Sequence, residues 1–306
     1  MSGRPMISFA IVNWKGGSVF EQCLASIAAE VEANQDLRCE VVVIDNASTH
    51  EELRFLYKYP FVRVIRNDRN VGYAIGMNQC LRACSGEHVF LLNNDVILLS
   101  GILRALHEYM AQHAKIGVIA PKLLYPDGRL QRSVRGLPTV SGLFHSLFLL
   151  DRFSRHFDHW HMRRFDYDKP SFVEQPMFSA LLMRAGVWRE VGELDEQFPL
   201  FFNDADWFRR FHAMGKWDCL YWPFHTCYHV HGMSTGRRRF RKVLESSTGM
   251  YRYFKKHDRL NFIQRVIVFA VIAALSIPRL GIEAARWLRA RPSTPTVPPP
   301  EAPSQR

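Results

Sequence analysis

Strand-like segments alternate with helical ones through the first 120 residues, and this alternation constrains the fold more than any other feature of the chain. Short runs rich in β-branched and aromatic residues predict buried strands at Ile7–Asn13, Glu40–Asp45, Phe61–Arg66 and Glu87–Leu92. Segments with helical spacing lie between or after them, at 18–32, 71–84 and 100–113. Such alternation predicts an α/β fold, built from βαβ units around a mostly parallel sheet.

Polar residues end these predicted strands, at Asn13, Asp45–Asn46 and Asn93–Asp95. Parallel strands are buried on both faces, and ligands of open α/β sheets sit at the carboxyl ends of the strands. The polar tips are therefore candidates for a binding site.

Two motifs near these tips each allow two interpretations. In IDNAST (44–49), Asp45 could accept hydrogen bonds from a nucleobase or a ribose, or the motif could be a turn that caps the next helix. The run RNDRNVGYAIGMN (66–78) has glycines for close backbone approach and arginines for phosphate, or it is a loop that opens a helix. It matches neither the Walker loop nor the glycine pattern of dinucleotide-binding folds.

A possible metal site involves Asp95, which ends the apolar run LLNNDV (91–96). A hard divalent cation with bound phosphates needs only one or two carboxylates. The run HTCYHVHGMS adds four potential ligands: His225, Cys227, His229 and His231. No second ligand pair at zinc-finger spacing accompanies them, which disfavours structural zinc. One histidine that joins Asp95 at a divalent site, or histidines that only pack and hydrogen bond, remain as interpretations.

Two aspartates follow an aromatic run in PLFFNDADWF (199–208). A general base must be a carboxylate or an imidazole placed near the hydroxyl that it deprotonates. Asp204 or Asp206 could serve in this way, and either could instead cap a helix predicted at 205–214.

The positive charge of the chain is concentrated near its C-terminal end. The chain has a net charge of +11, and the stretch 237–291 alone holds 14 basic and 3 acidic residues, which gives the same surplus. A local basic block suits nucleic acid, an anionic membrane face or simply a solvated surface. The uncharged stretch between Arg265 and Arg279 has 13 residues. Because a helix of that length falls short of the hydrocarbon core of about 30 Å, it predicts an interfacial or core helix.

The two ends of the chain and its cysteines bear on localisation. The N-terminus leads directly into a strand pattern without a signal peptide, and none of the six cysteines forms a C-x-x-C pair. These features predict free thiols in the cytoplasm. The proline-rich tail 292–306 predicts a disordered, extended segment.

Nine motifs in a fixed order resemble the family 2 glycosyltransferases, and most closely the bacterial rhamnosyltransferase-like branch. They span about residues 6–257, and their order makes the set specific although each motif is weak alone. The motifs are VNW (Val12–Trp14), CLASI (Cys23–Ile27), VVVIDNAST (Val41–Thr49), RNDRNVGYAIGMNQ (Arg66–Gln79), GEHVFLLNNDV (Gly86–Val96), IAPKLLYPDGRLQRS (Ile119–Ser133), FSALLMRAGVWREVGELDEQF (Phe178–Phe198), FFNDADWFRRFHAMG (Phe201–Gly215) and HVHGMS (His229–Ser234).

The resemblance implies a GT-A fold, a Rossmann-like domain that binds a nucleotide-diphospho-sugar, with a C-terminal basic helical extension in this chain. It divides the chain into a donor-binding half (1–120), an acceptor and base half (121–236), a membrane-associating extension (237–291) and a tail (292–306). It implies an inverting transfer to a hydroxyl of a glycan or polyprenyl-linked acceptor, on the cytoplasmic face of the inner membrane and without a nucleic-acid partner. Rhamnose is the leading donor sugar, ahead of galactofuranose and N-acetylhexosamines.

The resemblance also assigns residues. Asp95 and His229 would hold Mg²⁺ or Mn²⁺, with His231 as a rival to His229, and Asp204 would be the catalytic base. The residues assigned to the donor are Asn13, Asp45, Asn46, Arg66, Asn70, Gly72, Asn78 and Asn94.

Two departures from the family pattern keep alternatives open. The metal motif has a single carboxylate, and the family's Glu-Asp pair reads Asn203-Asp204. A neutral neighbour should leave the pKa of Asp204 less raised than an acidic one would. A non-catalytic scaffold of the same fold, or a nucleic-acid-binding protein that uses Arg237–Lys242, are the alternatives to the enzyme.

Overall fold

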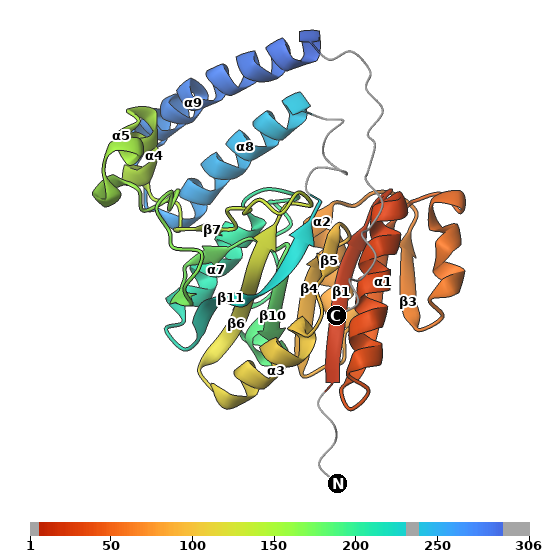
Figure 1. Ribbon diagram of the computed structural model, residues 1–306. Helices are drawn as coiled ribbons and strands as arrows, with labels where there is room; N and C mark the ends of the chain where they lie inside the picture. Colours follow the sequence, from red (N-terminus) through yellow and green to blue (C-terminus); the bar gives the residue numbers. More distant parts are fainter. Residues whose placement is uncertain (1–5, 231–238, 290–306) are drawn as a thin grey trace.

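A computed structural model describes residues 6–230 and 239–289, and a mixed β-sheet forms its centre (Figure 1). The strands of this sheet are β1 (Met6–Asn13), β2 (Arg38–Asn46), β3 (Val62–Asn67), β4 (His88–Asn93), β5 (Val96–Leu98), β6 (Ile116–Leu124), β8 (Ser171–Phe172), β10 (Ala180–Arg184) and β11 (Asp218–His229). Their order is β3-β2-β1-β4-β10-β6-β11-β5, with β8 paired to β11. A separate two-stranded ribbon joins β7 (Val134–Arg135) to β9 (Gln175–Pro176).

The four strands expected from the sequence are confirmed, and they are parallel to one another. β1 pairs with β2 on one side and with β4 on the other, and β2 pairs with β3. The buried residues of β2 are β-branched or otherwise apolar up to Asp45, because both faces of this strand are covered.

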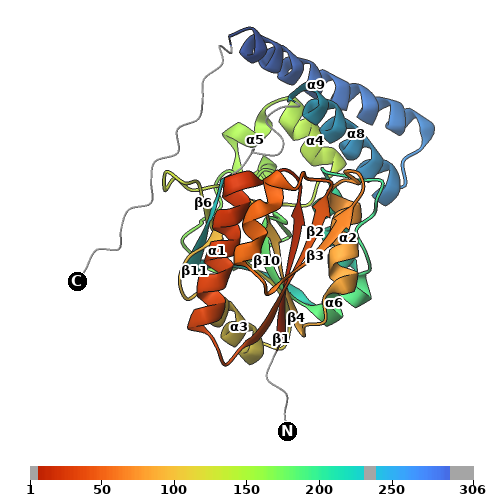
Figure 2. The same cartoon turned by 90° about the vertical axis from the view of Figure 1, so that its right-hand side faces the viewer.

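Helices cover both faces of the sheet, and Figure 2 shows α1 and α2 on opposite sides of it. One core contains residues of α1 (Gly17–Ala33) and α3 (Ile102–Gln112). The core on the other face contains residues of α2 (Tyr73–Ala83), α6 (Ala185–Val191) and α7 (Asn203–Ala213). A short 3-10 helix, η1 (Glu51–Lys58), follows β2.

The second half of the chain completes the same sheet. β10 runs antiparallel between β4 and β6, and β11 runs parallel to β6. The strand alternation of the first 120 residues predicts mostly parallel strands and gives no sign of these antiparallel insertions. The two halves expected from the resemblance therefore share one sheet and one pair of cores.

The C-terminal region forms a helical layer above the edge of the sheet at which β1 ends (Figure 1). It comprises α8 (Arg239–His257) and α9 (Phe262–Arg289), with α4 (Val140–Leu147), α5 (Leu150–Phe153) and η2 (Arg155–Phe157) beside them. A third core joins this layer to the loop before α7; its fully buried members include Leu143, Phe198, Tyr253, Phe254 and Val268.

Helix α9 is longer than the uncharged stretch in the sequence. It has 28 residues and continues through Pro278 rather than ending there. Within the described chain, Phe262–Ala285 is the one helix that is long and apolar enough to cross a bilayer by length and composition. Its Val268, Val271 and Ile272 are nevertheless buried against the rest of the protein.

Candidate active site

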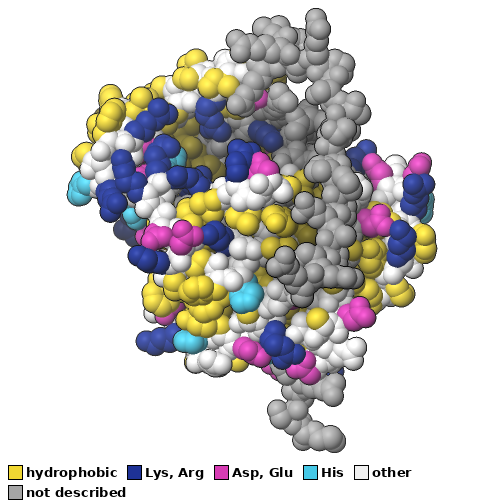
Figure 3. Space-filling view, in the orientation of Figure 1, with side chains coloured by type: hydrophobic (Ala, Val, Ile, Leu, Met, Phe, Trp, Pro, Cys, Tyr) yellow, Lys and Arg dark blue, Asp and Glu magenta, His cyan; other side chains and the backbone are white. Residues whose placement is uncertain are grey.

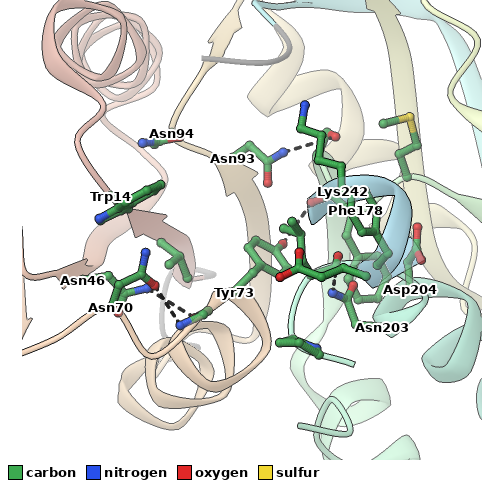
Figure 4. Close-up of a pocket in the computed structure, with 18 of the residues that line it drawn as sticks. Trp14, Asn46, Asn70, Tyr73, Asn93, Asn94, Phe178, Asn203, Asp204 and Lys242 are labelled. Atoms are coloured by element: carbon green, nitrogen blue, oxygen red, sulfur yellow. Dashed lines mark hydrogen bonds between the residues drawn. The ribbon is translucent and has the colours of Figure 1, made fainter. Parts of the chain in front are cut away.

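A cavity of about 620 Å³ opens at the carboxyl edge of the sheet, beneath the first turn of α8. Figure 4 shows Trp14, Asn46 and Asn70 on one side, Asn203, Asp204 and Lys242 on the other, and Tyr73 between them. Open α/β sheets bind their ligands at this edge, outside the carboxyl ends of the strands. Its lining includes the predicted site residues Asn46, Asn70, Gly72, Asn94, Asp95, Asp204 and His229.

Asp95 and His229 come together at one end of this cavity. His229 Nε2 lies 3.2 Å from Asp95 Oδ1, and both residues are almost completely buried. Strand pairing places them: His229 is opposite Val96 in the β11–β5 ladder, and the Val230 N–H donates to the Asp95 carbonyl at 2.9 Å. A carboxylate and an imidazole nitrogen that face each other form a suitable pair of ligands for a divalent cation.

Gln131 orients the imidazole from behind. Its Oε1 lies 2.8 Å from His229 Nδ1, and Gln131 is itself buried. Metal-binding histidines commonly use their second ring nitrogen in this way, because that bond fixes the ring orientation. Gln131 belongs to the motif Ile119–Ser133, but neither that motif nor the periodicity of the sequence assigned it a role.

The described residues contain no group of three or more metal-binding side chains, so the structural zinc site stays unsupported there. Cys227 belongs to the apolar core beneath α1 and α3. His231, the rival to His229, lies outside the described residues.

Asp45 is completely buried and organises the turn that follows β2. It accepts a hydrogen bond from Asn13 Nδ2 at 2.8 Å and one from the Ser48 N–H at 2.9 Å. Asn13 in turn accepts from Asn94 Nδ2 at 2.7 Å, and Asn94 lines the cavity. Asn13 and Asp45 therefore lie directly behind the cavity wall and support it.

Arg66 and Asn78 are not among the residues that line the cavity, and their donor roles stay predictions. Arg66 donates to the Ser48 carbonyl at 2.6 Å and lies 3.8 Å from Asp45, so it closes the same turn. Both ends of the Asn78 amide bind the backbone of Leu194 at 2.9 Å, and the residue is completely buried. Asn78 therefore joins α2 to the segment before α7.

The glycine-containing loop before α2 does line the cavity. Gly72 has a φ of 91°, a conformation that favours glycine, and its N–H donates to Asn70 Oδ1 at 2.9 Å. Its carbonyl accepts from Asn46 Nδ2 at 3.3 Å. Tyr73 and Ala74 begin α2, so their N–H groups have no acceptor within the helix. Both donate to the Pro199 carbonyl instead. The start of α2 is therefore tied to the loop that carries Asp204, and is not open for phosphate.

Asp204 faces the cavity at the start of α7. Burial raises the pKa of its carboxyl, and hydrogen bonds from the Ala205 N–H and the Gln175 side chain offset part of that effect. A carboxylate with a raised pKa, open to a cavity, is the arrangement expected of a general base.

Asp206, the alternative base, is occupied elsewhere. Its carboxylate is completely buried and contacts Arg210 at 3.1 Å, His257 at 2.8 Å and Lys256 at 2.5 Å. Burial alone would raise its pKa, but the bonds from His257 and Lys256 and the charge of Arg210 outweigh burial, and the pKa is lowered. Asp206 is thus an ionic link between α7 and α8.

Asn203 stabilises the loop that leads into α7. Its Nδ2 donates to the Leu200 carbonyl at 2.8 Å and to the Phe198 carbonyl at 3.4 Å, and the side chain is buried. A glutamate could not donate these bonds, and its carboxylate would face carbonyl oxygens. The departure from the family's Glu-Asp pair therefore has a structural consequence in this chain.

The basic block contributes to the cavity itself. Arg241, Lys242 and Glu245 of α8 line it, and Figure 4 shows Lys242 entering from above Phe178. From the sequence, this run was expected at a nucleic-acid, membrane or simply solvated surface, and not in a cavity. Its remaining residues before Arg239 lie outside the described chain.

Comparison with known families decides the classification. The family described as Glycosyl transferase family 2 matches residues 8–175, more than half of the chain. The chain belongs to this family. The match covers most of β1, the turn after β2, Asp95 and Gln131, and it ends at residue 175, before the segment that contains Asp204.

Two relatives differ in how much of their length the chain covers. The N-acetylglucosaminyl-diphospho-decaprenol L-rhamnosyltransferase of Mycobacterium tuberculosis is 27% identical over 243 residues, which cover 74% of this chain and 76% of that protein. The uncharacterized protein y4gI of Sinorhizobium fredii is 27% identical over 84% of this chain, but the chain spans only 28% of its length.

Solved structures share the fold, which is GT-A. The mannosyltransferase PcManGT from Pyrobaculum calidifontis, solved with GDP-Man and Mn²⁺, matches with a TM-score of 0.57 at 16% identity, over 95% of this chain and 77% of that one. S. aureus TarS 1-349 with UDP-GlcNAc matches with a TM-score of 0.54 at 16% identity, over 88% and 71%. This glycosyltransferase therefore has the expected GT-A fold, and it has a C-terminal helical layer.

Proposed function

We propose that this glycosyltransferase moves a sugar, with rhamnose as the lead, from a nucleotide-diphospho donor to a hydroxyl of a lipid-linked or polysaccharide acceptor with inversion. One observation carries the proposal: a single cavity contains both the Asp95–His229 pair and a carboxylate, Asp204, whose pKa burial raises. Inverting transfer needs charge neutralisation at the leaving group and a base at the acceptor, and these groups supply both.

The donor side of the cavity fits a divalent cation with a nucleotide diphosphate. Asp95 and His229 would hold Mg²⁺ or Mn²⁺, and the buried Gln131 keeps the imidazole in the ligating orientation. When bound, the cation neutralises the diphosphate leaving group. Two of the solved relatives, PcManGT and GalNAc-T7, contain Mn²⁺, which supports this proposal.

The nucleoside would lie against the wall built by Trp14, Asn46 and Asn94, which Asp45 supports from behind. An aromatic face and amide groups suit stacking and hydrogen bonding to a nucleoside. On the opposite side, Asp204 accepts the proton of the acceptor hydroxyl as that hydroxyl attacks the anomeric carbon. Phe178 and Phe201 beside it restrict water.

The relative that acts on a diphospho-decaprenol acceptor supports rhamnose and a lipid-linked acceptor. Other donor sugars, such as galactofuranose or an N-acetylhexosamine, would use the same groups. The proposal places the enzyme on the cytoplasmic face of the inner membrane, where such an acceptor is held.

Helix α9 provides the membrane contact in this proposal. Its buried face packs on α8, whereas the other face exposes large apolar side chains, among them Phe262 (79% exposed), Ile263 (68%) and Phe269 (60%). In Figure 3, hydrophobic side chains border the upper left of the molecule and lysines and arginines lie beneath them. An apolar face flanked by cations suits an anionic membrane surface.

Thermal denaturation with a panel of nucleotide-sugars, with and without Mn²⁺, tests the proposed donor site. The true donor should raise the Tm by mass action in the presence of Mn²⁺, and Asp95→Asn should abolish that increase. Asp127→Asn, which changes an exposed carboxylate far from the cavity lining, is the matched control. An equal Tm increase in wild type and Asp95→Asn would contradict the metal assignment.

A further inference from the structure

A second, smaller cavity lies on the acceptor side of Asp204 and is lined by three arginines and a histidine. It has a volume of about 270 Å³, and its lining residues are Arg132, Arg135, His161 and Arg163. None of these residues has a role in the donor site described above. Arg132 and Arg163 are exposed and Arg135 is half-buried, so the three guanidinium groups line a cavity that an anion could reach from solvent.

The pocket is assembled by backbone contacts between β7 and the segment that leads from η2 to β8. The Gly136 N–H donates to the Trp160 carbonyl at 3.0 Å, and Arg135 Nη1 donates to the His161 carbonyl at 3.0 Å. A Cβ on Gly136 would lie 2.2 Å from the His159 carbonyl oxygen. This close approach fixes Arg135 of β7 against the facing segment, which carries His161 and Arg163.

The local charges do not cancel. Arg163 pairs with the buried Asp151 at 2.8 Å, whereas Arg132 and Arg135 bind only carbonyl oxygens and form no ion pair within the described chain. Burial, Arg163 and the Arg135 charge together lower the pKa of His161 to about 4, so this histidine adds no charge at neutral pH. Burial, and then the neighbouring Arg163 and Arg132, lower the pKa of Arg135. Arg132 and Arg135 thus have no ion pair of their own in the described chain, although the charge of the buried Asp158 acts on Arg135.

The pocket lies between the catalytic base and an apolar surface. Arg135 is paired with Gln175 in the β7–β9 ribbon, and the Gln175 side chain bonds to Asp204. On the other side, Asp151 belongs to α5, where Leu150 and Phe153 are exposed; Phe153 is 82% exposed. α5 packs on α4, and α4 packs on the membrane helix α9. A ligand in the pocket would therefore have one end toward Asp204 and the other toward the membrane.

We propose that Arg132, Arg135 and Arg163 bind the diphosphate that links the acceptor glycan to its lipid. A diphosphate diester carries one negative charge on each phosphate, which matches the two unpaired arginines, and guanidinium groups bind phosphate oxygens in bidentate fashion. The glycan then extends toward Asp204 and the lipid toward α5 and α9. This inference rests on the proposed function for the identity of the acceptor, but the anion site itself does not.

Calorimetric titration with farnesyl diphosphate in EDTA tests the site without the donor or a metal. The double variant Arg132→Gln/Arg135→Gln should weaken binding by at least about tenfold, because each arginine supplies charged hydrogen bonds. Arg132→Gln alone, at an exposed position, should weaken it by a smaller factor, and lysine at both positions should give an intermediate affinity. Arg129→Gln removes a nearby charge that is paired with Asp127 and should change nothing.

Two further arms separate the possible failures. Binding of a nucleotide-sugar with Mn²⁺ should be unchanged in the double variant. If the wild type bound no nucleotide-sugar, the proposed function would be contradicted. The titration with farnesyl diphosphate would still test the arginine pocket. Sedimentation with phosphatidylglycerol vesicles should also be unchanged. Equal binding of farnesyl diphosphate by wild type and double variant, no binding by wild type, or loss of vesicle binding alone would overturn the inference.

Discussion

At the scale of residues, the site depends on side chains that hold other side chains in place. Gln131 orients His229, Gln175 contacts Asp204, and Asn203 fixes the loop before the base. The residues that would touch the substrate were predictable because they end strands or belong to recognisable motifs. The roles of the amides behind them were not predictable. Gln131 belongs to a family-like motif that gave it no role, and Gln175 lies in no motif and in no periodic segment.

Replacement of Gln131 by leucine should weaken the affinity of the proposed site for its metal ion. The substitution removes the bond to His229 Nδ1 but leaves both proposed ligands in place, and such supporting bonds are worth about 10–100-fold in metal affinity. The Mn²⁺ concentration for half-maximal transfer should rise accordingly, with a similar kcat at saturating Mn²⁺. An unchanged Mn²⁺ dependence would contradict the orienting role.

At the scale of elements, α8 connects the candidate active site to the C-terminal helical layer. Its first turn lines the donor cavity, Gly249 approaches the Phe201 carbonyl closely, and its last residues bind Asp206. The sequence predicted a basic extension but not this placement, because charge alone does not tell a solvated lysine from one that enters a cavity. The strands β1 to β4 were predictable from their apolar runs, whereas the antiparallel β10 depends on long-range pairing.

The Asp206 link should stabilise the junction of α7 and α8. Asp206→Asn leaves Arg210, Lys256 and His257 without their shared anion and should lower the free energy of unfolding by about 3 kcal/mol. Lys256→Gln leaves Asp206 two partners and should cost less. Because the pKa of Asp206 is lowered, its contribution is complete above the ordinary aspartate pKa and is lost as pH falls through the lowered value. Denaturant unfolding of both variants at pH 7 and at acid pH checks the prediction, and equal stabilities of wild type and Asp206→Asn would refute it.

At the scale of the whole molecule, the basic block contributes to two different regions, the cavity and helix α9. Arg241 and Lys242 line the donor cavity, whereas the later part of the block accompanies the apolar face of α9. The arginine pocket adds a third cationic region, outside the block. The proposed lipid-linked acceptor would require a fixed orientation of the enzyme on the membrane. Contacts among α4, α5, α8 and α9 join these helices into one layer that could provide it.

The exposed face of α9 should determine membrane association. Deletion of the helix would also strip Val268 and Val271 from the third core, so substitutions on the exposed face are the cleaner test. Phe262→Ser with Ile263→Ser and Phe269→Ser should shift the protein from the membrane to the soluble fraction without lowering the Tm. Tyr57→Ser, at an exposed position on η1, is the control. Retention of the triple variant on membranes would rule out docking through this face.

We propose that Asp204 is the catalytic base and that donor binding does not depend on this side chain. Transfer and donor affinity should therefore be measured in the same Asp204→Asn protein, with donor and Mn²⁺ saturating. We expect transfer to fall by about 10²–10⁴-fold, with donor affinity unchanged and a Tm equal to or above that of wild type, because burial disfavours the charged carboxylate. Near-wild-type transfer by Asp204→Asn would contradict the account.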